Sequence, residues 1–358
     1  MNRRASASAL AVMLVLGACS RGGKSQVGPG EGPISRPETS DHAALTGAGS
    51  TLATATVMQW AQRYRSVAPG VSVDFRAVGS DATADDQLRS GAVDFAVSER
   101  PDELADAASA IAAVPSAATA VVVTYNLPGL GGLRLSPVTL ARIFDGSLTS
   151  WNDAAIGGDN PGRALPALKI TPVTRSDPSS ATLLFSRYLD ASAPVVWTAG
   201  SGPTVAFAPR SGVVGPDALT KAVKDRPGSI GYASGAEATA AGLDIAMVKN
   251  SAGHFAAPTT GSMDAFLLGA EGTPDDLVLG TPFQTAASDA YPLSAFSYVF
   301  VPRVFSGTDK DKALRDFLRW ILSEGQRSLD PPGAAPLPLP LLVRTLEALQ
   351  SDDLRPRR

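Results

Sequence analysis

The sequence has few of the side chains that carry most enzyme chemistry. Its 358 residues include two histidines, His42 and His254, and a single cysteine, Cys19. A structural zinc site takes about four ligands and a disulfide takes two cysteines, so a His/Cys metal centre is nearly excluded and an intramolecular disulfide is excluded. The His-Glu-x-x-His motif of zinc hydrolases is missing as well. We therefore expect no catalytic residue, no metal and no cofactor.

An excess of positive charge is also lacking. Lysine and arginine number 31 against 34 aspartates and glutamates, which gives a formal net charge of −3. Because nucleic-acid binding requires a basic face against the phosphate backbone, this balance argues against a nucleic-acid partner. What the chain does have is 44% hydrophobic and 18% charged residues, the composition of a globular protein. Its length fits one large domain or two medium ones.

Residues 1–18 have the pattern of a secretion signal. Arg3 and Arg4 precede an apolar run that is too short to remain as a membrane span. Residues 16–19, Leu-Gly-Ala-Cys, resemble the bacterial lipobox, in which the cysteine becomes the lipidated N-terminus. We expect Cys19 to anchor the mature chain outside the cytoplasmic membrane. The alternative is an ordinary cleaved signal with a chance cysteine.

Residues 19–44 are expected to form a flexible tether, because they are rich in Gly, Ser and Pro and lack apolar periodicity. Gly23-Lys24-Ser25 in this tether looks like part of a phosphate-binding loop, but the first glycine of that motif is absent and no strand precedes it. Removal of residues 1–18 takes away two arginines and lowers the formal charge from −3 to −5.

The rest of the chain alternates strand and helix patterns. Apolar residues spaced by three and four predict helices, and apolar–polar alternation predicts strands. The expected elements are a strand ending at 45–46, a helix over 57–67, a strand over 71–77, a helix ending near Ser90, strands over 93–97 and 118–125, a helix over 137–144, a strand over 169–174, a helix from 178 to 189, a helix over 215–225, strands over 229–232 and 291–302, and a helix over 309–322. This order favours an α/β fold with a mainly parallel sheet covered by helices.

Three predicted strand-to-helix turns, 49–51, 79–80 and 177–180, carry small hydroxyl residues. In an open α/β sheet, ligands bind at the carboxyl ends of strands, where helix N-termini present N–H groups and partial positive charge. In the third turn Asp177 is the expected N-cap and Pro178 the first helical residue. Arg175 adds a planar cation on the same loop. Each turn alone fits plain capping chemistry, but the three together favour an anion-binding cleft.

A set of short motifs runs in one order through almost the whole mature chain. They are LTGAGST at 45–51, WA at 60–61, AVGS at 77–80, VDFAVS at 93–98, VTYNLPG at 123–129, SWND at 150–153, NPG at 160–162, RSD at 175–177, PGSIGY at 227–232, YPLS at 291–294 and EGQ at 324–326. Together they resemble the PstS family, the phosphate-binding lipoproteins of bacterial high-affinity phosphate ABC importers.

The resemblance implies a two-lobed class II periplasmic-binding-protein fold that closes over one phosphate. Lobe I would combine residues 45–122 with 292–350, and lobe II would be residues 123–291, with hinge strands near 120–125 and 291–301. The implied partners are inorganic phosphate, the membrane subunits of an ABC permease and, through the lipid anchor, a bacterial membrane. The chain would be a monomeric binding protein of the periplasm or cell surface and not an enzyme.

Carried over residue by residue, the family's site implies a phosphate pocket. Its predicted phosphate-binding residues are Thr51, Leu52, Ser80, Glu99, Arg175, Ser179, Ser180 and Ala181, with Asp177 supporting Arg175. Thr51, Ser80 and Ser179 would bond through hydroxyls, and Leu52, Ser180 and Ala181 through backbone N–H groups. The Glu99 carboxylate would accept the proton of hydrogen phosphate and so reject sulfate, which carries none.

Single residues depart from the family pattern at three positions, and the segment Gly215-Pro216-Asp217-Ala218 replaces the family's Gly-Asn-Glu/Asp-Gly before Pro227. Leu52 stands where the family usually has Phe, and Glu99, in place of Asp, reaches one methylene further. Ala181 stands in place of Thr and removes a hydroxyl donor worth about 1.5–3 kcal/mol, while Thr182 points about 100° further round the helix. The alternatives are therefore a binding protein or sensor with altered oxyanion specificity or weakened phosphate affinity, and, against the lack of metal ligands, an extracytoplasmic phosphatase.

Overall fold

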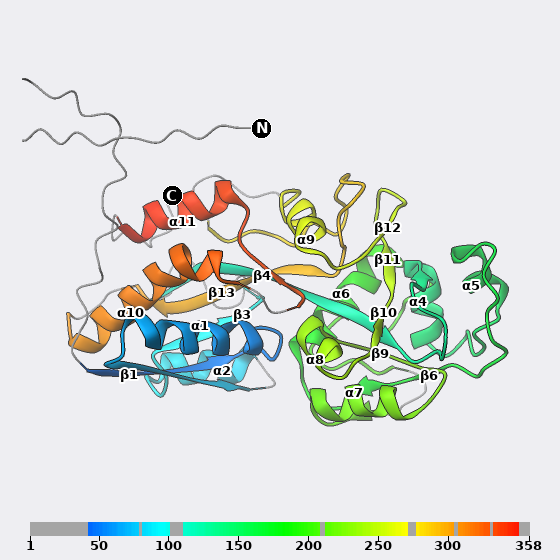
Figure 1. Cartoon of the computed structure of the whole chain (residues 1–358), viewed down its shortest axis with the longest axis horizontal. Helices are drawn as coiled ribbons and strands as arrows, with labels where there is room; N and C mark the ends of the chain where they lie inside the picture. Colours follow the sequence, from blue (N-terminus) through cyan, green and yellow to red (C-terminus); the bar gives the residue numbers. More distant parts are fainter. Residues whose placement is uncertain are drawn as a thin grey trace, which may run out of the picture. The chain divides into compact units, whose positions relative to one another are not determined.

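The structure is a computed structural model that describes residues 42–78, 81–100, 110–207, 212–270, 277–303, 307–329 and 332–350. Three features of the sequence fall outside these residues: the predicted secretion signal with Cys19, nearly all of the predicted tether, and Ser80. Figure 1 shows the course of the chain.

The first five elements have the β-α-β-α-β order that the sequence predicts. They are β1 (Ala43–Gly49), α1 (Thr54–Val67), β2 (Val71–Ala77), α2 (Asp81–Arg89) and β3 (Phe95–Ser98). β1 begins at Ala43, so the last two residues of the predicted tether, 43 and 44, belong to this strand. It pairs in parallel with β2 on one side and with β3 on the other. The loops that follow β1 and β3 therefore leave the same edge of the sheet.

Helix α1 packs one face against α10 (Asp309–Trp320), which lies beside it in Figure 1. The Tyr64 ring lies 5.0 Å from the Phe317 ring and 5.4 Å from the Trp320 ring, measured between centroids. Trp60 donates its indole N–H to the Gly325 carbonyl oxygen at 3.1 Å. That carbonyl belongs to a π-helical turn, Ile321–Gly325, that continues α10. This bond satisfies the buried indole N–H of Trp60.

Strand β4 (Ile111–Tyr125) joins two groups of strands, and each of its 15 residues is buried. It pairs antiparallel with β13 (Ser294–Pro302) through Ile111–Ala120 and with β9 (Ser229–Ser234) through Val121–Tyr125. The sheet order is β2-β1-β3-β13-β4-β9-β6, with β6 (Thr171–Pro172) at one edge. The prediction of a mainly parallel sheet is wrong, because β3–β13, β13–β4 and β4–β9 are antiparallel pairs. The strands predicted as a hinge thus belong to β4 and β13, whereas the division into two lobes stays a prediction.

Strand β4 is longer than the predicted 118–125. Its first half is rich in alanine and contains Pro115, and proline inside a strand normally argues against a central position because it donates no ladder hydrogen bond. Pro115 is opposite Tyr298, at the point where the pairing register with β13 shifts between Ser297 and Tyr298. The irregularity accommodates the missing N–H group, so the strand continues through the proline.

The predicted strand over 169–174 is wrong as a single element. β6 (Thr171–Pro172) pairs in parallel with β9, whereas β7 (Thr174–Arg175) pairs in parallel with β8 (Gly212–Val213). The chain therefore changes partner at Val173 and ends β7 at Arg175. This separation places Arg175 at the carboxyl end of a short strand, immediately before α6 (Ser180–Ser192).

Most of the remaining elements surround the part of the sheet that contains β9 and β6. They are β5 (Arg134–Leu135), α4 (Pro137–Phe144), α5 (Ala154–Asp159), α7 (Pro216–Asp225), α8 (Gly235–Ala240), β10 (Asp244–Ile245), β11 (Met247–Lys249), β12 (Phe255–Ala256) and α9 (Thr260–Leu267). In addition, β14 (Ala334–Ala335) pairs with the first half of β4, and α11 (Leu339–Gln350) lies beside α10 in Figure 1. An aromatic cluster fixes α6 against β9: the Phe185 ring stacks on the Tyr232 ring at 4.8 Å and meets the edge of Phe144 at 4.8 Å. The cluster sets the height of α6 above the sheet.

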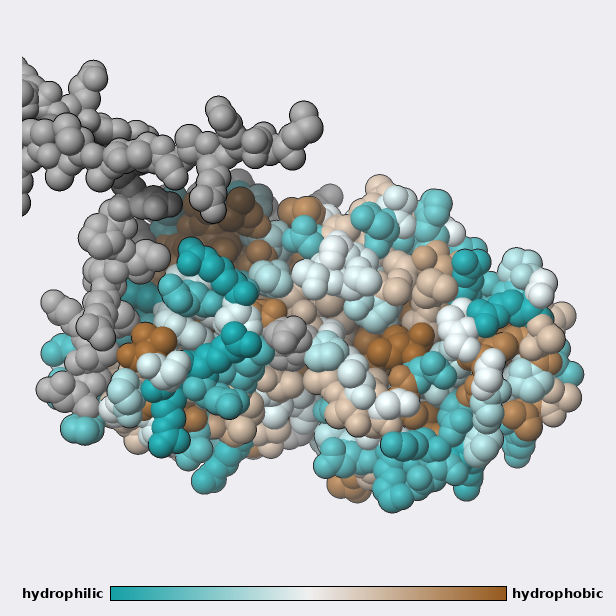
Figure 2. All heavy atoms as spheres, viewed as in Figure 1, coloured by the Kyte–Doolittle hydropathy of each residue, from teal (hydrophilic) through white to brown (hydrophobic). Residues whose placement is uncertain are grey.

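The surface over α7 is hydrophilic, as Figure 2 shows. Lys221 and Asp225, one turn apart on this helix, form an exposed ion pair at 2.5 Å. Exposed ion pairs of this kind contribute little to stability. The exposure of both side chains indicates that this face of α7 contacts solvent. In the described part of the chain, no helix has the length and apolar character needed to cross a bilayer.

Candidate anion-binding site

Helix α6 begins two residues later than the sequence predicts. Its N-cap is Ser179, whose Oγ accepts the Thr182 backbone N–H at 3.0 Å, and its first helical residue is Ser180. Asp177 is therefore not the cap, and Pro178 lies outside the helix. The reason is chemical: Arg175 engages the Asp177 carboxylate with two charge-assisted hydrogen bonds, which are stronger than a capping bond.

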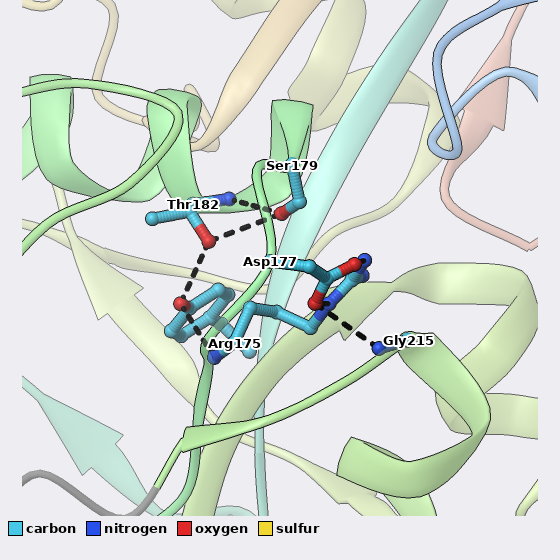
Figure 3. Close-up of polar contacts among 6 residues, drawn as sticks. Arg175, Asp177, Ser179, Thr182 and Gly215 are labelled. Carbon is cyan, nitrogen blue, oxygen red and sulfur yellow. Dashed lines mark hydrogen bonds and ion pairs between the residues drawn. The ribbon is translucent and has the colours of Figure 1, made fainter. Parts of the chain in front are cut away.

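Arg175 is held by its ion pair with Asp177 (Figure 3). Its Nε donates to Asp177 Oδ1 at 2.8 Å and its Nη2 to Oδ2 at 2.5 Å. The Gly215 N–H adds a bond to Oδ1 at 3.1 Å and ties the carboxylate to the start of α7. A guanidinium carries five N–H donors, so this pair uses two and fixes the plane of the group. Arg175 is only 7% exposed, although it is charged.

The pKa of the Asp177 carboxyl lies below its ordinary value of 3.8, mainly because Arg175 donates hydrogen bonds to it, while partial burial acts in the opposite direction. In the unfolded chain this carboxyl takes up its proton at higher pH than in the folded protein. The free energy of unfolding should therefore fall as the pH drops below about 4. We expect urea unfolding between about pH 5 and pH 3 to show a shallower loss for Asp177→Asn than for the wild type; equal slopes would contradict this.

A chain of hydroxyl groups links the start of α6 to β9. Ser179 Oγ and Thr182 Oγ1 are 3.0 Å apart, and Thr182 Oγ1 lies 2.8 Å from the Tyr232 phenol oxygen. That oxygen also accepts the Arg175 backbone N–H at 3.3 Å. Burial raises the pKa of Tyr232 to about 12, so its phenol stays protonated near neutral pH. The sequence predicts that Thr182 points about 100° further round the helix than Ala181. Because the N-cap is Ser179, Thr182 is the third helical residue and faces the Ser179 side chain.

The turn after β1 is built on a close approach between two strands. Gly49 pairs with Val97, and a Cβ at Gly49 would lie 2.0 Å from the Val97 carbonyl oxygen. Ser50 is 1% exposed; its backbone N–H donates to that oxygen at 2.8 Å, and its Oγ accepts the Leu52 N–H at 3.1 Å. Ser50 was not among the predicted site residues. The N–H predicted to bind the anion, that of Leu52, is engaged by it.

Glu99 follows β3 and lies at the same sheet edge as Thr51 and Leu52, because β1 and β3 are parallel neighbours. It is 8% exposed and lines a cavity of about 320 Å³. Arg187, from α6, lines the same cavity. The other lining residues are Val278, Leu279, Gly280, Thr281 and Phe283. Arg187 was not among the predicted site residues; the available signal was its seven-residue spacing from Ser180, which puts the two on one face of α6.

The predicted residues thus form two groups. Arg175, Asp177, Ser179, Ser180 and Ala181 lie on the loop and first turn of α6, where Ser180 is 5% and Ala181 4% exposed. Thr51, Leu52 and Glu99 lie on the loops after β1 and β3. Among the residues that the structure describes, no cluster of His, Cys, Asp or Glu side chains could hold a metal ion. The α6 group offers donors to an anion: helix N–H groups, a hydroxyl and a guanidinium.

The class of the protein follows from its α/β fold and from the predicted site residues, which lie on loops at the carboxyl ends of strands. A family model described as the PBP superfamily domain matches residues 36–325. The phosphate-binding protein PstS of Xylella fastidiosa (strain Temecula1) is 31% identical over 316 residues, which cover 87% of this chain and 86% of that protein. The phosphate-binding protein PstS 3 of Mycobacterium leprae is 31% identical over 328 residues, 88% of each chain. The chain belongs to the PstS family of phosphate-binding proteins.

Solved structures support the fold. A high-affinity periplasmic phosphate-binding protein, PfluDING, bound with phosphate, has a TM-score of 0.65 at 20% identity, covering 86% of this chain and 94% of its own. A phosphate-binding protein from Stenotrophomonas maltophilia has a TM-score of 0.59 at 18% identity, with coverages of 86% and 94%. These similarities confirm the expected periplasmic-binding-protein type of fold.

Proposed function

We propose that the protein captures inorganic phosphate outside the cytoplasmic membrane and delivers it to the membrane subunits of an ABC permease. The observation that carries the proposal is the buried Arg175 guanidinium, fixed by Asp177 beside the N-terminus of α6. The names of the PstS relatives and the phosphate bound to one structural neighbour support the choice of ligand.

Capture of an anion by this chain must rest on local groups. The formal net charge is −3, so the protein as a whole does not attract phosphate. Arg175 is paired with Asp177, and the two charges offset each other at a distance. At contact range, the guanidinium still presents N–H donors, and the first turn of α6 adds its own N–H groups and partial positive charge. Because these donors act only at contact range, they favour a small ligand that fits closely against them.

Selection among anions is assigned to Glu99. A buried carboxylate at the end of β3 accepts a hydrogen bond from an anion that still carries a proton, and it repels one that is fully ionised. Hydrogen phosphate and hydrogen arsenate have that proton, and sulfate lacks it near neutral pH. The same carboxylate is one methylene longer than aspartate, so the anion sits further from β3 or the side chain folds back.

The anchoring of the protein is part of the proposal. The lipobox-like residues 16–19 assign lipid attachment to Cys19, and residues 20–42 then link the lipid to β1. A tethered monomer searches a small volume next to its permease, which raises its local concentration there. The assigned location is the periplasm or the outer face of the cell.

A calorimetric titration of residues 21–358 with phosphate and with sulfate, across about pH 5–8, tests the proposal. We expect binding heat with phosphate at every pH and none with sulfate, because only phosphate keeps a proton for Glu99. Glu99→Gln should reduce the difference between the affinities for phosphate and for sulfate. Absence of phosphate binding would sink the proposed function, whereas sulfate binding as strong as phosphate would sink only the role of Glu99. Release of product from a phosphate ester would indicate an enzyme instead.

A second candidate keeps the fold and changes the ligand. Ala181 is buried at the second helical position of α6, where it offers no hydroxyl, and Glu99 shares its cavity with Arg187. Both features favour an oxyanion receptor of altered specificity or a sensor of weakened phosphate affinity. In the same titration this candidate predicts that another tetrahedral oxyanion, such as arsenate, binds more tightly than phosphate.

A further inference from the structure

We propose that Tyr232 and Thr182 are positioning residues that aim the Ser179 hydroxyl proton at the bound anion. The inference rests on the proposed function and adds to it a polarity for the hydrogen-bond chain Tyr232–Thr182–Ser179. The hydroxyl chain acts on one donor, Ser179 Oγ, and its phenol end also accepts the Arg175 backbone N–H.

The number of protons in the chain restricts its direction. Three hydroxyl groups carry three protons, and the two contacts between them, at 2.8 and 3.0 Å, use one proton each. One proton is therefore left over. It belongs to Tyr232 if the chain runs toward the phenol, to Ser179 if the chain runs away from it, and to Thr182 if both neighbours donate to the threonine.

The Tyr232 end decides between these arrangements. The phenol is 1% exposed, and burial keeps it protonated. Its oxygen already accepts the Arg175 backbone N–H, and in the described part of the chain the remaining contact of this oxygen is Thr182 Oγ1. Because a buried O–H donor needs an acceptor, the phenol proton goes to Thr182. A left-over proton on Tyr232 is thereby excluded.

Ser179 Oγ accepts the last hydrogen bond of this hydroxyl chain. Thr182 is fully buried, and in the described part of the chain its hydroxyl contacts Tyr232 and Ser179. Having accepted from Tyr232, it has Ser179 Oγ as the acceptor for its own proton, which excludes the arrangement in which both neighbours donate to the threonine. Ser179 Oγ also accepts the Thr182 backbone N–H at 3.0 Å. A serine oxygen has two lone pairs, and both are then filled. The left-over proton is that of Ser179, and the direction of its O–H bond is set by the two bonds that it accepts. Ser179 is itself fully buried, so an anion enclosed at this turn meets a serine that can only donate.

The same phenol steadies the two phosphate contacts of this loop together. Tyr232 holds the Arg175 backbone on one side and, through Thr182, the Ser179 side chain on the other, as the run of dashed contacts in Figure 3 shows. Its ring is fixed by stacking on Phe185 at 4.8 Å. A guanidinium and a hydroxyl on one loop thus share a fixed reference in β9, which lowers the entropy cost of arranging them around the ligand.

The test compares two substitutions at one position. Thr182→Val keeps the shape and removes the hydroxyl, whereas Thr182→Ser keeps the hydroxyl. In calorimetric titrations of the full chain in detergent with inorganic phosphate, we expect Thr182→Val to bind about three- to tenfold more weakly, the range of one net hydrogen bond. Thr182→Ser should bind within about twofold of the wild type, and Tyr232→Phe should weaken binding in the same direction as Thr182→Val.

A double-mutant cycle separates aiming from general destabilisation. In a Ser179→Ala background, Thr182→Val should change phosphate affinity by less than about twofold, because the donor it orients is gone. Thermal unfolding without phosphate identifies the variants that are folded at the titration temperature. Unchanged affinity of folded Thr182→Val, or an undiminished effect in the Ser179→Ala background, would overturn the inference. If the wild type itself bound no phosphate, the proposed function would fail first.

Discussion

Arg175→Ala is expected to remove phosphate binding, with a loss of affinity of about a thousandfold or more. Two effects act together. The anion loses the guanidinium donors, and the Asp177 carboxylate, now without its partner, faces the site as an uncompensated negative charge. Removing one member of a buried ion pair costs more than the pair contributes, and the Asp177 side chain, 25% exposed, regains only part of its solvation. Calorimetric titration with phosphate measures the loss directly.

Two control variants sharpen this result. Arg175→Lys keeps a positive charge but cannot make the two-pronged contact with Asp177, so we expect an affinity between those of the wild type and the alanine variant. Arg89→Ala removes an arginine whose side chain is 44% exposed and paired with Asp85 on α2; it should leave phosphate affinity unchanged. Phosphate binding by Arg175→Ala at wild-type strength would show that the site lies elsewhere.

Gly49→Ala is expected to lower the free energy of unfolding by about 3 kcal/mol or more. The added Cβ would lie 2.0 Å from the Val97 carbonyl oxygen, at a backbone φ of +156°. The obstacle is backbone and not the end of a flexible side chain, so β1 and β3 must separate. The Ser50 N–H bond to the same oxygen, 2.8 Å long, is lost as they do. Urea or thermal unfolding followed by circular dichroism measures the change.

Gly157→Ala is the matched control for that substitution. Gly157 lies inside α5, and a Cβ there meets no atom within 4 Å. Alanine favours helices over glycine by up to about 1 kcal/mol, so this variant should be as stable as the wild type or more so. A Gly49→Ala protein that unfolds at the wild-type temperature would contradict the close approach of β1 and β3.

Elements set by local signals were predicted well. The helix predicted over 137–144 is α4 with the same bounds, because Ser136 accepts the Thr139 N–H as N-cap and Pro137 suits the first helical position. The amphipathic stripe that predicted a helix over 309–322 is α10 and the π-helical turn after it. In both, the helix start and its apolar face are encoded within a few neighbouring residues.

Elements that depend on distant partners were missed or misplaced. The alanine-rich first half of β4 is a strand because β13 pairs with it, and no residue near Pro115 announces that pairing. The start of α6 was placed at Asp177 because aspartate is a good cap. Asp177 is instead taken by Arg175, with Gly215, 38 residues further along, as its third partner. Asp177 could either cap the helix or pair with Arg175, and the charge-assisted ion pair is the stronger of the two interactions.

The sequence by itself determined the family, the βαβαβ order and the residues proposed to bind an anion, because motifs and periodicity are properties of neighbouring residues. Only the tertiary structure decided how those residues are used. It turned Thr182 toward Ser179, brought Tyr232 to the Arg175 backbone from 57 positions away, and put Glu99 and Arg187 on one cavity. Such contacts join segments far apart in the chain, and the packing of α6 on β9 sets them.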